Sequence, residues 1–217
     1  SAHMPGNAVA VAHVTNVIAA GYTNLSTLPA FTNNLPFLMC LETTNGTLRW
    51  ATNSTNSGHY NSVAVYGDKV IAVGAAYAQG NTLQSSNLIE QWSIAGGTQT
   101  LSFITNLPGG CTSWLSQVIA IESLDRAYAV GSLLDANQQV HAVLAEIDLQ
   151  TLAVVSFVTN YISTYNTVLP GVGKSTNYGK AITTDGVDLY VAVEGPGDGN
   201  FQDRQAGIFR YRAKNFY

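Results

Sequence analysis

The sequence predicts an all-β fold in which a unit of four short strands recurs along the chain. The clearest unit spans residues 61–106, where four runs rich in β-branched and aromatic residues are separated by Gly, Asp and Asn turns. The second strand of successive units ends at Gly21, Gly74 and Gly131, in steps of 53 and 57 residues. A period of this length with four strands per unit predicts a β-propeller of about four blades.

The second strands are apolar on both faces, as a propeller requires. Residues 70–74 read VIAVG and residues 127–131 read AYAVG. A strand with one solvated face would alternate apolar and polar residues instead. Because each blade is covered on both faces by its neighbours, we expect these strands to be buried throughout.

The same pattern places the remaining strands. First strands are predicted at residues 8–12, 62–66, 118–122 and 180–184, and second strands at 17–21, 69–75, 127–131 and 189–193. Third strands are predicted at residues 37–42, 88–94 and 207–212, and the fourth strands end in the related runs TLRWATN, TLSFITN and VVSFVTN. The last unit lacks a clear fourth strand, so its blade is expected to be incomplete.

One domain accounts for nearly the whole chain of 217 residues. Residues 1–4 resemble a tag-cleavage scar, and residues 5–217 are expected to form a single propeller. Its blades would lie at about residues 7–58, 61–112, 115–176 and 179–217. We expect four blades to close a ring alone; the alternatives are a ring made by two copies and membership of a larger propeller.

Composition limits the partners and the location. Hydrophobic residues make up 46% of the chain and charged residues 10%, whereas ordinary domains carry about 25% charged residues. So low a proportion of charged residues suits a secreted or cell-surface protein. We expect this chain to be such a protein from a microbe. The net charge of −4 argues against nucleic acid and anionic membranes as partners. No run is long enough to cross a bilayer, so no membrane insertion is expected.

The two cysteines are expected to be free thiols. Cys40 lies in an apolar strand and Cys111 in a Pro-Gly-Gly loop. Nothing in the sequence brings their Cα atoms within the ~7 Å that a disulfide needs.

The segment at residues 40–50 reads CLETTNGTLRW and resembles a known docking motif. The motif is the Ala-x-Asp-x-x-x-Gly-x-x-x-Trp pattern of quinoprotein-like (PQQ-like) propellers. Gly46 and Trp50 match it, while Glu42 stands for the Asp and Cys40 for the Ala. The resemblance implies that Trp50 packs between blades and ties one blade to the next.

The likeness weakens in later units. The second unit keeps Gly97 but ends in Phe103, and the third has Asp148 and Phe157 without the Gly. The repeats also resemble the short propeller repeats of bacterial surface proteins. Both resemblances imply the fold rather than a function. A quinone cofactor is not expected, because the quinoprotein rings are larger and more regular.

Aromatic residues precede three of the four first strands, at Tyr60, Trp114 and Tyr178. In a propeller the loop before the innermost strand opens near the axis, so these residues, with His59, would ring the channel mouth. Such a rim could stack on sugars or hold an apolar anchor of a protein. The alternative is that the side chains plug blade junctions. The long insertion 160–178 is a further candidate binding loop.

A polar loop late in the chain is the one candidate cation site. Asp198, Asn200 and Asp203 offer oxygen ligands of the kind that calcium prefers. The loop lacks the EF-hand pattern and its terminal Glu, so we expect no cofactor, with calcium as the alternative.

Catalytic motifs are missing from the sequence. It holds no Gly-x-Ser-x-Gly elbow, His-Glu-x-x-His, Cys-x-x-Cys, P-loop or dinucleotide fingerprint. His13, His59 and His141 fall in three different units, and His13 and His141 adjoin apolar strands, where a structural role is expected. No catalytic residue is therefore predicted.

The sequence favours a non-catalytic module that binds a protein or glycan through one propeller rim. A first alternative is a glycan-acting or metal-dependent enzyme at the channel mouth, with His59, Asp198 and Asp203 as its first candidates. A second is a structural piece of a larger assembly or homo-oligomer, in which the open edge of the last blade pairs with another chain.

Overall fold

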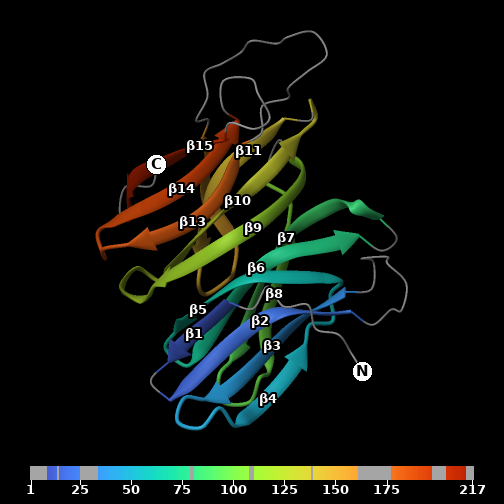
Figure 1. The fold of residues 1–217 in the computed structure, drawn as a ribbon, viewed down its shortest axis with the longest axis vertical. Helices are drawn as coiled ribbons and strands as arrows, with labels where there is room; N and C mark the ends of the chain where they lie inside the picture. Colours follow the sequence, from blue (N-terminus) through green and yellow to red (C-terminus); the bar gives the residue numbers. More distant parts are fainter. Residues whose placement is uncertain are drawn as a thin grey trace.

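The chain is an all-β propeller whose four blades follow one another in sequence order (Figure 1). The structure is a computed structural model that describes residues 9–13, 15–24, 34–78, 81–107, 110–137, 139–160, 177–196 and 204–213. Within these ranges, four antiparallel sheets contain four, four, four and three strands. The last blade is thus incomplete among the described residues, as the sequence predicts.

Each blade is a meander whose strands pair in chain order. Blade 1 comprises β1 (Val9–His13), β2 (Asn16–Asn24), β3 (Asn34–Glu42) and β4 (Leu48–Asn53). Blade 2 comprises β5 (Gly58–Tyr66), β6 (Lys69–Ala78), β7 (Asn81–Ser93) and β8 (Gln99–Thr105). Blade 3 comprises β9 (Gly110–Ile121), β10 (Arg126–Asp135), β11 (Val140–Asp148) and β12 (Val154–Asn160), with the 3-10 turn η2 (Glu122–Leu124) after β9. Blade 4 comprises β13 (Tyr178–Thr184), β14 (Asp188–Pro196) and β15 (Arg204–Arg212).

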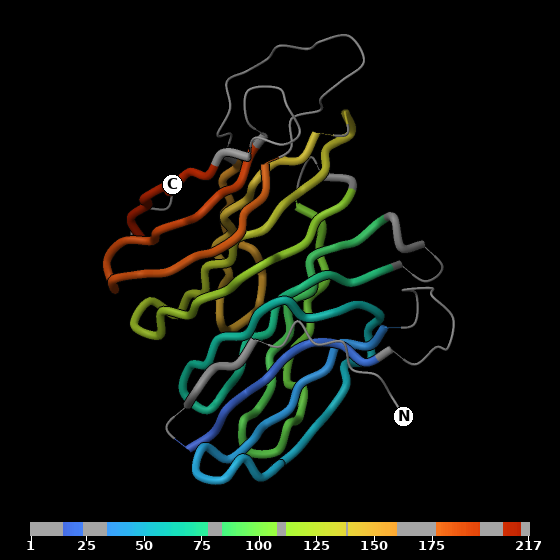
Figure 2. The backbone as a smooth tube through the Cα atoms, viewed as in Figure 1, coloured from blue at the N-terminus to red at the C-terminus, as the bar shows by residue number. Residues whose placement is uncertain are grey.

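The blades form an open arc. The first strands β5, β9 and β13 contact one another in series and therefore lie innermost. Each blade packs on the next, but no comparable packing joins blade 1 to blade 4 in the described part of the chain. Blade 1 and blade 4 occupy opposite ends of the long axis (Figures 1 and 2). The expectation that four blades close a ring alone is therefore corrected.

The core lies between blades rather than within one sheet. Three apolar clusters fill the junctions between blades 1 and 2, 2 and 3, and 3 and 4. Strand β6 contributes to two of them, with Val70 and Ala72 facing blade 1 and Ile71 and Val73 facing blade 3. Both faces of this strand are buried, as its continuous apolar sequence predicts.

Two of the second-strand glycines allow a close approach of backbones. A Cβ atom on Gly74 would lie 2.0 Å from the His59 carbonyl oxygen, and one on Gly131 would lie 2.1 Å from that of Trp114. The inner strand presses directly on the second strand at these points. Only glycine fits there, which is why it recurs in the second strand. The strands β6 and β10 continue beyond these glycines and do not end there as the sequence predicts.

Trp50 ties blade 1 to blade 2. Its indole Nε1 donates a hydrogen bond of 2.7 Å to the carbonyl oxygen of Ile94, in the turn between β7 and β8. Its ring covers Gly97, where a Cβ would lie 2.6 Å from the indole. Trp50 therefore packs between blades, the role that the docking motif implies.

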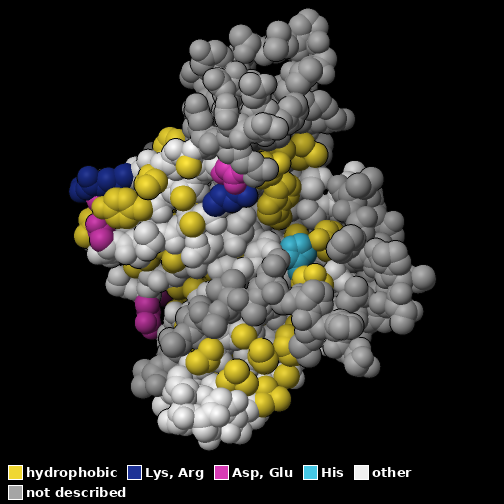
Figure 3. Space-filling view, viewed as in Figure 1, with side chains coloured by type: hydrophobic (Ala, Val, Ile, Leu, Met, Phe, Trp, Pro, Cys, Tyr) yellow, Lys and Arg dark blue, Asp and Glu magenta, His cyan; other side chains and the backbone are white. Residues whose placement is uncertain are grey.

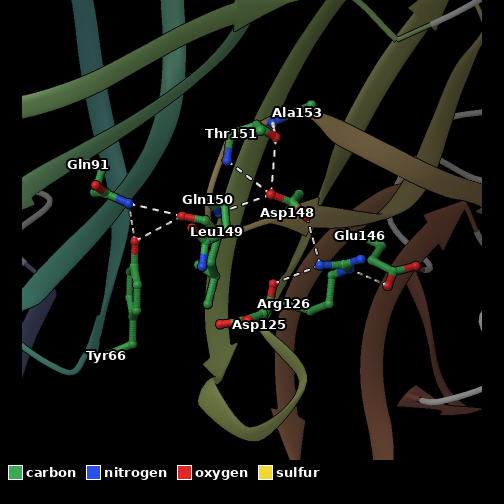
Figure 4. A network of polar contacts seen from close by, with 10 residues as sticks. All are labelled: Tyr66, Gln91, Asp125, Arg126, Glu146, Asp148, Leu149, Gln150, Thr151 and Ala153. Atoms are coloured by element: carbon green, nitrogen blue, oxygen red, sulfur yellow. Dashed lines mark hydrogen bonds and ion pairs between the residues drawn. The ribbon is translucent and has the colours of Figure 1, made fainter.

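An equivalent contact is present at the next two junctions. We call it a latch: a side chain of one blade that donates a hydrogen bond to the backbone just after the third strand of the following blade. Gln91 donates to the carbonyl oxygen of Leu149 at 3.0 Å, beside the Tyr66 hydroxyl (Figure 4). Tyr128 donates to the carbonyl oxygen of Ala213 at 2.7 Å. A different side chain serves at each junction, so the tryptophan motif does not repeat in the sequence.

Cys40 is a free, buried thiol in the junction between blades 1 and 2. Burial raises the pKa of this thiol, which makes it unreactive at neutral pH. The side chain of Cys111 lies outside the described residues.

Candidate functional site

Three inner strands share one local irregularity that shapes the mouth of the arc. A β-bulge falls between Tyr60 and Ser62 in β5, between Leu115 and Gln117 in β9, and between Gly179 and Ala181 in β13. A bulge re-aims the residues that precede it. His59, Trp114 and Tyr178 each stand two residues before the bulged residue, so they are structural equivalents. We call these three residues the rim.

Tyr60 does not belong to the rim, contrary to the prediction. Its side chain is 0% exposed and packs with Leu88 and Trp92 in the junction between blades 1 and 2. Its equivalents in the next blades are Leu115 and Gly179. Residue type alone aligns Tyr60 with Trp114, because the sequence does not reveal the bulge. The alternative that such a residue plugs a junction is correct for Tyr60.

The rim residues also lie within strands, not in the loops that the sequence predicts. β5, β9 and β13 begin two to eight residues before the predicted first strands, and the added residues pair with β6, β10 and β14. Strand pairing holds these side chains more firmly than a loop would, which favours a pre-formed site.

Trp114 and Tyr178 form an aromatic pair across the junction of blades 3 and 4. Their ring centroids are 6.3 Å apart with an interplanar angle of 39°, and both side chains are partly exposed. The bulged Lys180 lies with Nζ 5.0 Å above the Tyr178 ring and 2.9 Å from Oε2 of Glu194. Two flat apolar faces therefore adjoin an ion pair at the surface.

His59 forms a second aromatic group with Tyr22 and Tyr77. The Tyr77 hydroxyl lies 2.9 Å from His59 Nδ1, and the Tyr22 ring meets the imidazole edge-on at 6.1 Å. Sequence reasoning missed both tyrosines, although each follows a second-strand glycine by one or three residues. Burial lowers the pKa of His59, so the imidazole is neutral at pH 7.

This lowered pKa makes stability depend on pH. The unfolded chain protonates His59 near the ordinary pKa of 6.5, whereas the folded chain does so only at a lower pH. Between these two values the unfolded state binds more protons, so the unfolding free energy falls as the pH drops from 7 towards 5. We expect His59→Phe to flatten this loss, measured by urea unfolding at pH 7, 6 and 5. Profiles of parallel slope in wild type and variant would contradict the assignment.

A closed polar network lies behind Tyr60. The Glu90 carboxylate is 0% exposed, and Oε2 accepts a hydrogen bond from the Tyr60 hydroxyl. Oε1 accepts from four further donors, at 2.6 to 3.0 Å: Ser54, Asn56, Gln99 and Ser102. The sequence does not single out Glu90, because its donors come from three separate segments. Because the carboxylate at its centre is closed to solvent, the network stabilises the junction rather than forming a binding site, although Ser102 at its edge is exposed.

The described residues offer no metal centre. Within them, no group of three or more His, Cys, Asp or Glu side chains could hold a metal ion. Asp198, Asn200 and Asp203 lie outside the described ranges, as do most of the insertion 160–178 and the side chain of His13. His141 is buried, with Nε2 3.0 Å from Oδ2 of Asp135. This pairing agrees with the structural role expected of it.

One face of the molecule shows how these features meet solvent (Figure 3). Hydrophobic side chains lie beside a histidine and beside a basic and acidic pair near the middle of this face. None of the helical segments in the described ranges is long and apolar enough to span a membrane.

Comparison with known proteins supports the fold alone. No protein-family model matches the chain, and no curated protein is significantly similar to it. A solved neuraminidase-like protein from A/bat/Guatemala/164/2009 superposes with a TM-score of 0.55 at 12% identity, over 94% of this chain and 54% of that one. An acylaminoacyl peptidase superposes with a TM-score of 0.51 at 8% identity, over 97% of this chain and 33% of that one.

A third solved structure is the β-propeller domain of the Trilobed protease from Pyrococcus furiosus. It gives a TM-score of 0.43 at 10% identity, over 98% of this chain and 70% of that one. By the coverages given above, the chain spans about half the length of the neuraminidase-like protein and a third of the length of the peptidase.

Proposed function

We propose that this propeller is a non-catalytic binding module that takes a glycan at its inner-strand rim. The observation that carries the proposal is the Trp114–Tyr178 pair, held by two neighbouring inner strands beside Lys180 and Glu194. The low charge of the chain fits a secreted or cell-surface location, which we include in the proposal.

The geometry of the pair suits a sugar ring. A pyranose has an apolar face of C–H groups that stacks on aromatic rings, and hydroxyls around its edge that need hydrogen-bond partners. The rings of Trp114 and Tyr178 are tilted by 39° to each other, so each can offer an aromatic face to the same ligand. The Lys180 ammonium can donate to hydroxyls, and the Glu194 carboxylate can accept from them. Sites with mainly apolar walls and a few placed polar groups are typical of small-ligand binding.

Catalysis finds less support than binding. The enzyme alternative depends on His59 together with Asp198 and Asp203, and the latter two lie outside the described residues. His59 is engaged by the Tyr77 hydroxyl within its aromatic group. A protein ligand with an apolar anchor remains the second candidate, because Trp114 and Tyr178 would also cover such an anchor.

The test is a glycan array with purified protein, followed by calorimetry on the best hit. We expect Trp114→Ala combined with Tyr178→Ala to weaken that affinity by about 10- to 100-fold, which corresponds to ~1.4–2.8 kcal/mol. Trp114→Phe combined with Tyr178→Phe keeps both aromatic faces and should retain most of the affinity. Thermal melting establishes that both variants fold.

Two results would overturn the proposal. One is the absence of any glycan retained above background. The other is a folded double-alanine variant that binds its glycan as tightly as wild type. If a pull-down instead captures a protein that the double-alanine variant loses, the rim binds protein rather than glycan.

A further inference from the structure

Each internal blade has two packed faces. We call the face toward the preceding blade the leading face and the face toward the following blade the trailing face. At every junction within the chain, a trailing face packs on a leading face. The two ends of the arc leave one face of each kind without a partner among the described residues: the trailing face of blade 4 and the leading face of blade 1.

The trailing face of blade 4 has the features of a junction face. Ile208 pairs with Ala192 in β14, as Leu144 pairs with Val130 in β10, so Ile208 and Leu144 are equivalent. The corresponding third-strand residues of the first three blades are Leu38, Ile89 and Leu144, which are 0%, 0% and 1% exposed. Ile208 is 78% exposed. A position that is fully buried at three junctions is thus open at the fourth.

Charges at one end of this face do not argue against packing. In blade 3, Arg126 of β10 pairs with Glu146 at 3.2 Å and with Asp148 at 2.8 Å (Figure 4). This triad lies on the trailing side of blade 3, and blade 3 still packs on blade 4 through an apolar cluster. An ion triad at the edge of a blade is therefore compatible with a junction.

Blade 4 carries the same triad with its charges reversed. Asp188 occupies the position of Arg126, and the positions of Glu146 and Asp148 hold basic residues, Arg210 and Arg212. Arg210 Nε donates to Asp188 at 2.7 Å, and Arg212 Nε lies 3.6 Å from it. Both arginine side chains are mostly exposed, as expected of a junction that lacks its partner.

The tyrosine that serves as the latch of blade 3 has an equivalent in blade 4, where its hydroxyl bonds within its own blade. Tyr190 is the equivalent of Tyr128, since Tyr190 pairs with Arg210 as Tyr128 pairs with Glu146. Tyr128 latches onto Ala213 in the next blade, whereas the Tyr190 hydroxyl donates to the exposed Asp185 at 2.9 Å.

The matching acceptor lies in blade 1. The residue that accepts a latch follows the third strand, and its N–H bonds back to the turn between the first two strands. This holds for Ile94, Leu149 and Ala213. In blade 1 the same backbone bond is made by Thr43, from N–H to the Thr15 carbonyl at 3.1 Å. Thr43 is exposed.

The leading face of blade 1 is apolar in the pattern of the other leading faces. Leu41 pairs with Val17 as Trp92 pairs with Val70, and both Trp92 and Val70 are buried at the junction with blade 1. The face is formed by partly exposed and small apolar side chains: Val17, Ala19, Phe37, Met39 and Leu41. Hydrophobic side chains gather over β2–β4 in the space-filling view (Figure 3).

We propose that the trailing face of blade 4 docks onto the leading face of blade 1 in a second copy of this chain. The chain supplies one face of each kind, and its three internal junctions show that such faces fit one another. Two copies related by a two-fold axis would make two identical head-to-tail junctions and close a ring. That ring would have eight blades, within the range that propellers adopt. Closure would also bury Ile208 and cover both unpaired ends.

The test measures mass in solution with the 217-residue chain at about 100 μM, by light scattering after size exclusion. Wild type should have twice the 23.0 kDa of one chain. Ile208→Glu on one face and Met39→Glu on the other should each give a monomer. Ile208 is exposed and Met39 is partly exposed, so the variants should melt as single folded species. Val155→Glu is the matched control at an exposed apolar residue of β12, and should leave the mass unchanged.

Mixing the two monomeric variants distinguishes head-to-tail docking from the pairing of two like faces. Head-to-tail docking leaves one intact junction between an unaltered blade 4 and an unaltered blade 1, so an equimolar mixture should regain the two-chain mass. If blade 1 instead pairs with blade 1, Ile208→Glu stays dimeric and the proposal is wrong. A monomeric wild type also overturns it, and would mean that something other than a second copy covers these faces.

Discussion

Gly131→Ala should be among the most damaging single substitutions in this protein, lowering the unfolding free energy by about 3 kcal/mol or more. Its Cβ would lie 2.1 Å from the Trp114 carbonyl oxygen, which belongs to the paired backbone of β9 and cannot rotate away. Gly179 of the next blade also approaches closely, since a Cβ there would lie 2.4 Å from the Gly131 carbonyl oxygen. The substitution therefore strains the pairing of β9 with β10 in blade 3, and any shift of the Gly131 backbone in response would meet Gly179 of blade 4.

Thermal melting and urea unfolding measure the effect. For a chain of this size, 3 kcal/mol corresponds to a fall in Tm of about 6–12 °C. Gly96→Ala is the matched control, because a Cβ there meets only the Thr98 hydroxyl, at 3.5 Å. Its melting should match that of wild type within about 0.5 kcal/mol. If Gly131→Ala melts like Gly96→Ala, the close approach of backbones does not limit stability.

The architecture could be predicted because propeller packing imposes a local sequence signature. A strand covered on both faces must be apolar throughout, and β6 and β10 meet this condition with the runs VIAVG and AYAVG. The glycine that ends each run has a steric cause that repeats with the blade. Repeats of this kind carry the fold even where no family model matches the chain.

The rim could be predicted only to within a residue. The sequence shows aromatics before the inner strands, but the bulge that decides which residue faces the mouth depends on pairing with the neighbouring strand. That is why the sequence predicts both Tyr60 and His59 on the rim, whereas the structure buries Tyr60 and leaves only His59 there. Tyr22 and Tyr77 were missed because they belong to other strands and meet His59 only after folding.

Of the three latches, only that of Trp50 could be predicted, from the docking motif. Gln91 and Tyr128 perform the same task with other side-chain chemistries, so no motif marks them, and the open arc could not be predicted either. Whether four blades close depends on small angles between successive blades, which strand patterns do not encode. Ile208 looks like any third-strand core residue in the sequence, and only the structure shows it exposed.

Glu90→Leu should destabilise the protein by about 3–5 kcal/mol, the other very large effect that we expect. The carboxylate is the shared acceptor for Tyr60, Ser54, Asn56, Gln99 and Ser102. Leucine matches its volume approximately but accepts no hydrogen bond. The buried donors of Tyr60 and Ser54 would therefore lose their partner at once, and the partly buried Asn56 and Gln99 would lose theirs as well. Each buried donor left unsatisfied costs about 1–3 kcal/mol, although relaxation and water entry reduce the sum.

Glu90→Gln separates hydrogen bonding from charge. The amide keeps one acceptor oxygen but turns an NH2 group toward donors, so we expect a smaller loss of about 1–3 kcal/mol. Glu122→Gln, at an exposed position in η2, serves as the control and should leave the unfolding free energy within about 0.5 kcal/mol of wild type.

The opposite result for Glu90→Leu has a clear physical meaning. Burying a charge costs several kcal/mol, and apolar replacements of buried ionic groups are sometimes neutral or stabilising. A Glu90→Leu variant as stable as wild type would show that desolvation of the carboxylate cancels its five hydrogen bonds. Urea unfolding of the three variants therefore decides whether this network stabilises the junction of blades 1 and 2. If it does, the hydrogen bond from the Tyr60 hydroxyl to Glu90 helps to hold Tyr60 inside the junction, while the neighbouring His59 lies on the rim.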